Sequence, residues 1–231
     1  MILQRNNDRM KKTTYAIILF LIFSNCALAA DETSDVIAKN IAAKTVNLKP
    51  SVAKLAIEAF FKAKHAGINV KKSILTIIDY TMASTQKRLW VVDLKNKQVL
   101  YNSLVAHGKY SGENYTTNFS NRMGSLQTSL GLFLTEETYF GHDGYTLRLA
   151  GLEKGFNDNA RNRLIVFHGA PYVNQKFAAA AGRIGRSWGC PAVETPLAKP
   201  IIDTIKGGSL IFSYSNHPVW LSESKFINTQ V

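Results

Sequence analysis

A cysteine and a histidine have the residue types and spacing of a nucleophile and its base. Cys190 stands between a glycine and a proline in the stretch GRSWGCPAV, and His168 lies 22 residues earlier, after the apolar run LIVF. A thiol with its ordinary pKa of about 8.5 is mostly protonated at neutral pH, so it needs a base such as imidazole to become the attacking thiolate. The pair predicts acyl transfer to the sulfur.

Two glycines adjoin this pair. Gly169 follows His168 directly, and its missing side chain leaves room for a substrate or for another stretch of backbone. Gly189 precedes Cys190 and permits backbone conformations that direct amide N–H groups into one concavity, which is the usual way to hold a tetrahedral oxyanion. We therefore expect an oxyanion hole built from the amides near Gly189 and Cys190.

Short runs of β-branched and aromatic residues predict the strands that hold this pair. Seven such runs follow Lys72. They are Ile74–Asp79, Arg88–Leu94, Gln98–Ala106, Leu130–Thr135, Tyr145–Ala150, Leu164–His168 and Ser209–Tyr214. Lys95-Asn96-Lys97 is expected to join two of them as a hairpin, and the Gly/Ser/Asn-rich segment from His107 to Ser129 is typical of a functional or mobile loop.

Apolar residues at helical spacing predict one or two helices between Ser34 and Ile68, and shorter helices at Asn174–Ala181 and Pro196–Lys206. Because strands dominate, we expect a mainly β, α+β fold: a mixed or antiparallel, sandwich-like β architecture with peripheral helices. We divide the chain into an N-terminal helical segment, residues 30–72, and a catalytic domain, residues 73–231.

The N-terminus has the layout of a secretory signal peptide over residues 1–29. Four basic residues precede an apolar run from Tyr15 to Leu28, and the run ends in Ala27-Leu28-Ala29. It is shorter than the roughly 20 residues of a membrane-spanning helix, so we expect cleavage near Ala29-Ala30 and a secreted or periplasmic protein without a membrane anchor. A lipid-modified Cys26 is the alternative, but the residues before it lack the small side chains of such a processing site.

Loss of residues 1–29 would leave Cys190 without a cysteine partner. A free thiol in an oxidising compartment is a liability unless the protein uses it. The remaining 24 basic and 15 acidic residues give a formal net charge of +9. That charge suits association with an anionic polymer such as a cell wall. The basic residues are scattered, without a basic run or an aromatic-interleaved strip, so we predict no nucleic-acid partner.

The other histidines suggest no second site. His107 ends a strand-like run, where it either lines the cleft or serves the structure, and we favour the structural role. His142 lies in the turn-like sequence GHDG. Cys190 with two histidines could in principle bind zinc, but the chain has no local pair such as Cys-x-x-Cys or His-x-x-x-His. We predict neither a metal nor a cofactor.

At these residues the chain resembles the L,D-transpeptidases of bacterial cell walls, whose signature pairs a strand-end His-Gly with a downstream Ser-x-Gly-Cys. The matching residues are His168-Gly169 and Ser187-Trp188-Gly189-Cys190. Further matches from Met123 to Val193 resemble one branch, the murein L,D-transpeptidase catalytic-domain family. The resemblance covers roughly residues 74–215.

The resemblance implies Cys190 as nucleophile, His168 as acid and base, and the Gly169 carbonyl as the group that orients the imidazole. Better-known members have His and Arg where this chain has Trp188 and Ala192. We hypothesise that Arg183 or Arg186 replaces the missing positive charge. The expected substrate-binding residues are Ser187, Trp188, Arg186, Arg183, Tyr139 and Arg148. For three of them structural roles stay open: Ser187 in the catalytic loop, Trp188 in packing and Arg148 in a pair with a neighbouring carboxylate.

The resemblance also implies a function, a substrate and an inhibitor. Cys190 would attack the third residue of a peptidoglycan stem tetrapeptide and expel D-alanine, and an amine of a neighbouring stem would resolve the acyl-enzyme into a 3-3 cross-link. Carbapenems would acylate the thiol. Water as acceptor would make the protein an L,D-carboxypeptidase. A further alternative is the hydrolysis or formation of a bond between peptidoglycan and a protein lysine. The non-enzymatic alternative is a wall-binding module that kept the cleft but lost activity.

Overall fold

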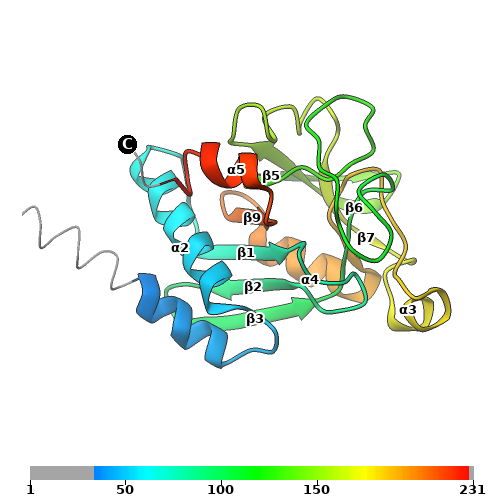
Figure 1. Cartoon of the computed structure of the whole chain (residues 1–231), viewed down its shortest axis with the longest axis horizontal. Helices are drawn as coiled ribbons and strands as arrows, with labels where there is room; N and C mark the ends of the chain where they lie inside the picture. The colour runs from blue at the N-terminus through cyan, green and yellow to red at the C-terminus, as the bar shows by residue number, and fades with distance from the viewer. Residues whose placement is uncertain (1–33, 229–231) are drawn as a thin grey trace, which may run out of the picture.

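The computed structural model describes residues 34–228, so the predicted signal peptide and Cys26 lie outside the described residues. Residues 34–43 are helical. The elements that follow, shown in Figure 1, are α2 (Pro50–His65), β1 (Ile74–Asp79), β2 (Leu89–Asp93), β3 (Gln98–Ser103), β4 (Val105–Ala106), β5 (Gly131–Gly141), β6 (Gly144–Gly151), β7 (Val166–Ala170), α3 (Gln175–Ala181), β8 (Ala192–Glu194), α4 (Thr195–Ile205), β9 (Leu210–Tyr214) and α5 (Pro218–Glu223).

The strands form one mixed sheet in the order β3-β2-β1-β9-β5-β6-β7-β8-β4. Two neighbouring pairs, β1 with β9 and β7 with β8, are parallel, and the others are antiparallel. The edge strands β3 and β4 are separated in sequence by Leu104 alone, although they stand at opposite ends of this order. The sheet must therefore curl until its edges approach each other. The expected mainly β, α+β class is confirmed.

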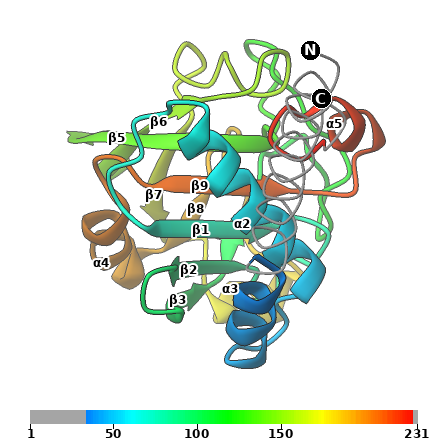
Figure 2. The same ribbon diagram turned by 90° about the vertical axis from the view of Figure 1, so that its left-hand side faces the viewer.

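Strand alternation divides the apolar residues between two cores, because successive side chains point to opposite faces of a sheet. In β1, Leu75 and Ile77 join the core that includes helix α2, whereas Ile78 joins the core that includes α4. In β9, Phe212 belongs to the first core and Ile211 to the second. Figure 2 shows α2 lying across the face formed by β1 and β9. The sheet is thus covered by a helix on each side.

Helix α2 follows from its sequence. Pro50 occupies the first turn, where a missing N–H costs no hydrogen bond. The last turn contains the basic residues Lys62, Lys64 and His65, and basic side chains there interact favourably with the helix dipole. Its apolar stripe includes Phe60, which is 2% exposed against the sheet. This helix of the 30–72 segment therefore shares a core with strands of the 73–231 segment.

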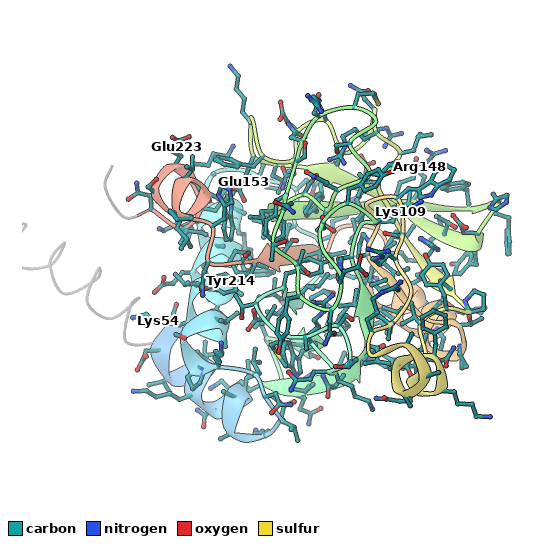
Figure 3. The ribbon with its side chains drawn as sticks, turned by 45° about the vertical axis from the view of Figure 1, so that its right-hand side comes forward. Lys54, Lys109, Arg148, Glu153, Tyr214 and Glu223 are labelled. Atoms are coloured by element: carbon teal, nitrogen blue, oxygen red, sulfur yellow. The ribbon has the colours of Figure 1, made fainter. Side chains whose placement is uncertain are left out.

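Helix α5 is tied to the sheet by a buried carboxylate. Glu153 accepts hydrogen bonds from the backbone N–H of Leu132 at 2.6 Å and from the indole N–H of Trp220 at 3.0 Å. Figure 3 shows Glu153 beneath α5, away from Lys109 and Arg148 on the other side of the molecule. Burial raises the pKa of Glu153, and these donors oppose the shift.

The structure corrects the predicted strand Leu164–His168. Strand β7 runs instead over Val166–Ala170, because Leu164 has a φ of 56° and cannot continue a strand. His168 therefore lies in the middle of β7, not at its end. The predicted strand Gln98–Ala106 is divided into β3 and β4, and the short strand β8 was not predicted. The hairpin at residues 95–97 is confirmed between β2 and β3.

In the part of the chain that the structure describes, none of the helices combines the length and the apolar character needed to cross a bilayer.

Candidate active site

His168 and Cys190 line one cleft with a volume of about 590 Å³. The β5–β6 hairpin contributes Tyr139 and Asp143 to its walls, and the residues just before Cys190 contribute Trp188. Met123, Gly124 and Leu126 of the 107–129 loop also line the cleft. Three segments that are distant in sequence therefore meet around the thiol.

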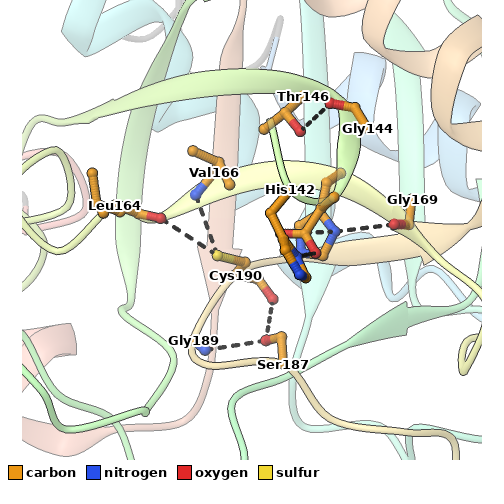
Figure 4. Close-up of polar contacts among 11 residues, drawn as sticks. His142, Gly144, Thr146, Leu164, Val166, Gly169, Ser187, Gly189 and Cys190 are labelled. Atoms are coloured by element: carbon orange, nitrogen blue, oxygen red, sulfur yellow. Dashed lines mark hydrogen bonds and ion pairs between the residues drawn. The ribbon is translucent and has the colours of Figure 1, made fainter. Parts of the chain in front are cut away.

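The imidazole of His168 is held in one orientation. His168 is 4% exposed, and its Nδ1 lies 3.0 Å from the carbonyl oxygen of Gly169. A carbonyl oxygen only accepts hydrogen bonds, so Nδ1 must carry the proton and Nε2 must present its lone pair. Figure 4 shows this contact beside Cys190. In this tautomer His168 can act as a base through Nε2.

Strand pairing places the thiol near the same strand. His168 pairs with Ala192 across the parallel strands β7 and β8. The Cys190 sulfur accepts a hydrogen bond from the backbone N–H of Val166 at 3.4 Å and donates to the carbonyl oxygen of Leu164 at 3.6 Å. Val166 and His168 are two residues apart, so their side chains share one face, separated by about 7 Å along the strand.

No hydrogen bond joins the thiol to the imidazole among the described residues. Cys190 is half-buried, and burial raises the pKa of its thiol to about 11. The N–H of Val166 and the charge of Arg163 act in the opposite direction, while the carboxylate of Asp143 raises the pKa further. In the free protein, therefore, the sulfur is a neutral thiol at neutral pH.

The loop before the thiol is held by Ser187. Its hydroxyl donates to the carbonyl oxygen of Cys190 at 2.6 Å and accepts from the N–H of Gly189 at 3.1 Å. Ser187 borders the cleft but is only 4% exposed, and its hydroxyl bonds to the backbone of the loop. Because the Gly189 N–H is engaged, it is not available to an oxyanion in this conformation. The N–H of Cys190 makes no hydrogen bond within residues 34–228 and remains available.

The two glycines of the motif are required for different reasons. Gly189 has a φ of 121°, and a Cβ there would lie 2.7 Å from the carbonyl oxygen of Gln127. Gly169 has an ordinary φ, but a Cβ there would lie 2.7 Å from the Cβ of Ala198 in helix α4. The space beside Gly169 is thus filled by another element of the protein.

Asp143 is a cleft residue that the sequence did not single out. It follows His142 at the tip of the β5–β6 hairpin, and its Oδ2 lies 4.0 Å from Nδ1 of His168. This distance is too long for a hydrogen bond, but it is at the limit of an ion pair. The sequence GHDG indicated only a turn, and only the pairing of β6 with β7 brings this turn to His168.

The arginines near the thiol differ in their partners. Arg183 and Arg186 share one carboxylate partner, Glu113, at 2.8 and 2.6 Å. Of these two, only Arg186 lines the cleft. Arg163 also lines the cleft, and its charge lowers the pKa of the Cys190 thiol. The hypothesis that Arg183 or Arg186 supplies the charge that acts on the thiol therefore does not fit these contacts, whereas Arg163 does.

The remaining expected cleft residues are partly engaged elsewhere. Arg148 forms an ion pair with Glu137 at 3.0 Å and stacks over the ring of Tyr139 at 4.3 Å from its centroid. Tyr139 itself lines the cleft. Trp188 is 75% exposed at the cleft, so it is not packed into the core. Ala192 is fully buried in strand β8, where a charged side chain has no access to the cleft.

His107 occupies the buried position that a structural role predicts. Its Nδ1 lies 2.8 Å from the guanidinium of buried Arg88, and its Nε2 lies 3.2 Å from the carbonyl oxygen of Gly112. The arginine only donates and the carbonyl only accepts, so the ring is neutral with its proton on Nε2. Burial, helped by the charge of Arg88, lowers the pKa of His107 to about 4. Its carbonyl oxygen accepts from the N–H of Ser187 and so supports the cysteine loop.

Within residues 34–228, no group of three or more His, Cys, Asp or Glu side chains is arranged to hold a metal ion. The groups that line the cleft include one thiol, one carboxylate, two imidazoles and two guanidiniums. A thiol beside a base and an oriented backbone N–H suits attack on a carbonyl carbon.

Comparison with known families decides the classification. A family model described as the L,D-transpeptidase catalytic domain matches residues 44–214, well over half of the chain. The chain belongs to the L,D-transpeptidase catalytic-domain family. The matched range includes the cleft and both motif segments of this L,D-transpeptidase domain, His168-Gly169 and Ser187–Cys190. No protein of curated function matches the chain in sequence.

Solved structures similar to this L,D-transpeptidase domain include three from different organisms. An L,D-transpeptidase from Mycobacterium smegmatis is 15% identical, with a TM-score of 0.38 over 62% of this chain and 59% of that one. One from Stackebrandtia nassauensis is 14% identical, with a TM-score of 0.38 over 81% and 93%. The helical cell shape determining protein Pgp2 from Campylobacter jejuni is 12% identical, with a TM-score of 0.40 over 67% and 53%. The likeness concerns the fold alone, and this chain spans little more than half of the Mycobacterium and Campylobacter chains.

Proposed function

We propose that the protein is a secreted cysteine L,D-transpeptidase of peptidoglycan, with Cys190 as nucleophile and His168 as acid and base. Membership in the family supports the reaction class. The proposal rests on one observation: the thiol and an imidazole with a free Nε2 line the same cleft. The substrate is the stem tetrapeptide, and the product is a 3-3 cross-link.

In the first step, Nε2 of His168 takes the thiol proton as sulfur bonds to the carbonyl carbon of the third stem residue. Bound substrate must bring the two groups together, since catalytic hydrogen bonds are often long in the free enzyme. The N–H of Cys190 donates to the oxyanion. The bond to the nitrogen of D-alanine then breaks, the imidazolium returns its proton to that nitrogen, and D-alanine leaves.

In the second step, an amine from a neighbouring stem attacks the thioester. His168 accepts a proton from this amine, the carbon–sulfur bond breaks, and the sulfur recovers a proton. A new amide joins the two stems. Asp143 stabilises the imidazolium that forms in both steps, because its carboxylate lies 4.0 Å from Nδ1. Water in place of the amine gives carboxypeptidase activity with the same groups, and a protein lysine gives a wall linkage.

The test is turnover of a defined disaccharide tetrapeptide by the full chain. We expect release of D-alanine, and the Cys190→Ala variant should turn over at least about a thousandfold more slowly, because the nucleophile is gone. Mass spectrometry of the products separates the acceptors: dimers indicate transpeptidation and tripeptides indicate trimming. Equal rates for the wild type and a folded Cys190→Ala variant would exclude Cys190 as the nucleophile.

A catalytically inactive wall-binding module is the second candidate. Two observations favour it: the thiol is held by backbone groups, and burial raises its pKa to about 11. The two candidates differ in their reaction with a carbapenem. A transpeptidase should give a mass adduct on Cys190, whereas a binding module should give none, retain binding to insoluble peptidoglycan and leave muropeptides unchanged.

A further inference from the structure

Arg163 carries a charge without a carboxylate partner in the part of the chain that the structure describes. Its terminal nitrogens donate to the carbonyl oxygens of Ser120 and Gln127 and to the hydroxyls of Ser125 and Ser129. All four acceptors are neutral, and Nε–H makes no hydrogen bond there. Burial of a charge costs free energy unless an opposite charge compensates it. This half-buried guanidinium therefore offers the cleft an uncompensated positive charge.

Contacts place this charge beside the thiol. Arg163 donates to the carbonyl oxygen of Gln127 at 2.7 Å, and that oxygen lies 2.7 Å from the position of a Cβ on Gly189. Cys190 follows Gly189 directly. On the other side, Leu164 follows Arg163, and its carbonyl oxygen accepts the thiol hydrogen at 3.6 Å. The guanidinium of Arg163 is thus bound to the carbonyl group that packs against Gly189, the residue after Arg163 accepts the thiol hydrogen, and the charge of Arg163 lowers the pKa of the thiol.

The backbone around Arg163 is held in an unfavourable conformation. Leu126 and Leu164, which both line the cleft, have φ angles of 53° and 56°. Branched residues rarely adopt such angles, and local strain of this kind is found where a site over-determines the backbone. Hydrogen bonds from Arg163 to Ser125 and Gln127 hold the segment that contains Leu126. The guanidinium is thus fixed in place before any ligand binds.

We propose that Arg163 binds the free carboxylate of the substrate residue that leaves when the acyl-enzyme forms. This inference rests on the function proposed above, and it names the feature of the substrate that the cleft selects. When the scissile bond is the last peptide bond of the stem, the terminal carboxylate lies only a few bonds from the carbonyl carbon that the sulfur attacks. A cation beside the sulfur therefore lies within reach of that carboxylate. Stems that are longer or blocked at this end place a neutral group there.

The test compares a tetrapeptide stem that has a free terminal carboxylate with the same stem as its terminal amide. The ratio of kcat/KM for acid over amide should be at least about tenfold in the wild type, because a hydrogen bond between two charges is much stronger than one to a neutral amide. Arg163→Gln should lower this ratio to below about twofold. Arg163→Lys, which keeps the charge, should retain a clear preference for the acid.

Arg163 also holds the 120–129 loop, so the ratio and not the rate alone decides the question. A merely structural role would slow both substrates equally and leave the ratio unchanged, which would overturn the inference. The matched control is Arg161→Gln, because this exposed arginine lies two residues before Arg163 and pairs with Glu136 and Glu137. It removes the same charge and should preserve the ratio.

A second measurement requires no turnover. Anionic iodoacetate and neutral iodoacetamide alkylate the same thiolate, so their rate ratio at Cys190 reports the local charge; Cys190→Ala corrects for labelling at Cys26. The rate ratio of iodoacetate to iodoacetamide should be severalfold lower in Arg163→Gln than in the wild type. In the wild type, this ratio should also fall as the salt concentration rises. An unchanged ratio in both experiments refutes the inference. Absence of tetrapeptide turnover with a changed alkylation ratio refutes only the proposed function.

Discussion

The Cys190 thiol meets opposing influences in the free protein. Burial and the Asp143 carboxylate favour the neutral thiol, while the Val166 N–H and the charge of Arg163 favour the thiolate. Burial has the largest effect and raises the pKa to about 11. The proposed function therefore requires a proton acceptor that comes into range of the sulfur when substrate binds.

Removal of the Asp143 charge should make the thiol more acidic. Because this carboxylate raises the pKa of Cys190, Asp143→Asn should lower that pKa slightly, since the Asp143 side chain is 47% exposed and water screens its charge. The pH dependence of alkylation by iodoacetamide measures the change. Glu223→Gln removes the same charge from the distant helix α5, visible in Figure 3, and should leave the titration unchanged. An unaltered titration in Asp143→Asn would contradict the electrostatic link.

At the scale of elements, the loop from Gly182 to Pro191 connects helix α3 to strand β8 and presents the thiol. Its backbone is set by Ser187, which bridges Gly189 and Cys190, and by the N–H of Ser187, which donates to the carbonyl oxygen of His107. A side chain within the loop and a backbone carbonyl from outside it thus determine where the sulfur lies. Because the loop is short, a change in the backbone at Gly189 should displace Cys190.

Gly189→Ala should damage this loop selectively. The new Cβ would face the Gln127 carbonyl oxygen at 2.7 Å with φ at 121°, so we expect a loss of about 1–3 kcal/mol in stability and loss of carbapenem labelling at Cys190. Thermal unfolding and mass spectrometry measure the two effects. Gly182→Ala is the control: its φ is 69°, but nothing lies within 4 Å of the new Cβ. It should lose some stability and keep labelling; equal labelling in both variants would contradict the prediction.

At the scale of the whole molecule, a buried polar unit connects the curled sheet to the cysteine loop. The guanidinium of Arg88 donates to the carbonyl oxygens of Met82 and Val105 and contacts the imidazole of His107. The backbone of His107 in turn holds Ser187. This connection links a histidine far from Cys190 in sequence to the loop that carries the thiol, although His107 does not line the cleft.

The buried His107 should make the fold sensitive to acid. Its pKa falls from about 6.5 in the unfolded chain to about 4 in the fold, so its contribution is full above pH 6.5 and is lost as the pH falls toward 4. The linked loss is roughly 3 kcal/mol. Urea unfolding at pH 7.5 and 4.5 measures it. His107→Gln, which cannot titrate, should lose less stability between these pH values than the wild type; an equal loss would contradict the assignment.

Much of the fold could be predicted from local patterns. The β-branched run Ile74–Asp79 predicts the bounds of β1 correctly, and Asn174 caps α3 through its side chain, as a helix starting there requires. The prediction failed at Leu164, where the apolar run LIVF favours a strand but the φ of 56° prevents one. It also missed β8, a strand of three residues that exists only because β4 and β7 pair with it.

The sequence by itself determined which two residues are the candidate reactive pair. Cys190 and His168 could be identified because a thiol, an imidazole and two glycines at this spacing have a recognisable chemistry. Only the tertiary structure decided which charges act on that pair. The pairing of β6 with β7 places Asp143 near His168. Hydrogen bonds to the 120–129 loop hold Arg163 near the thiol, and Glu113 forms ion pairs with Arg183 and Arg186. Local patterns report which groups a segment contains, whereas electrostatic partners depend on distances between segments that are remote in sequence.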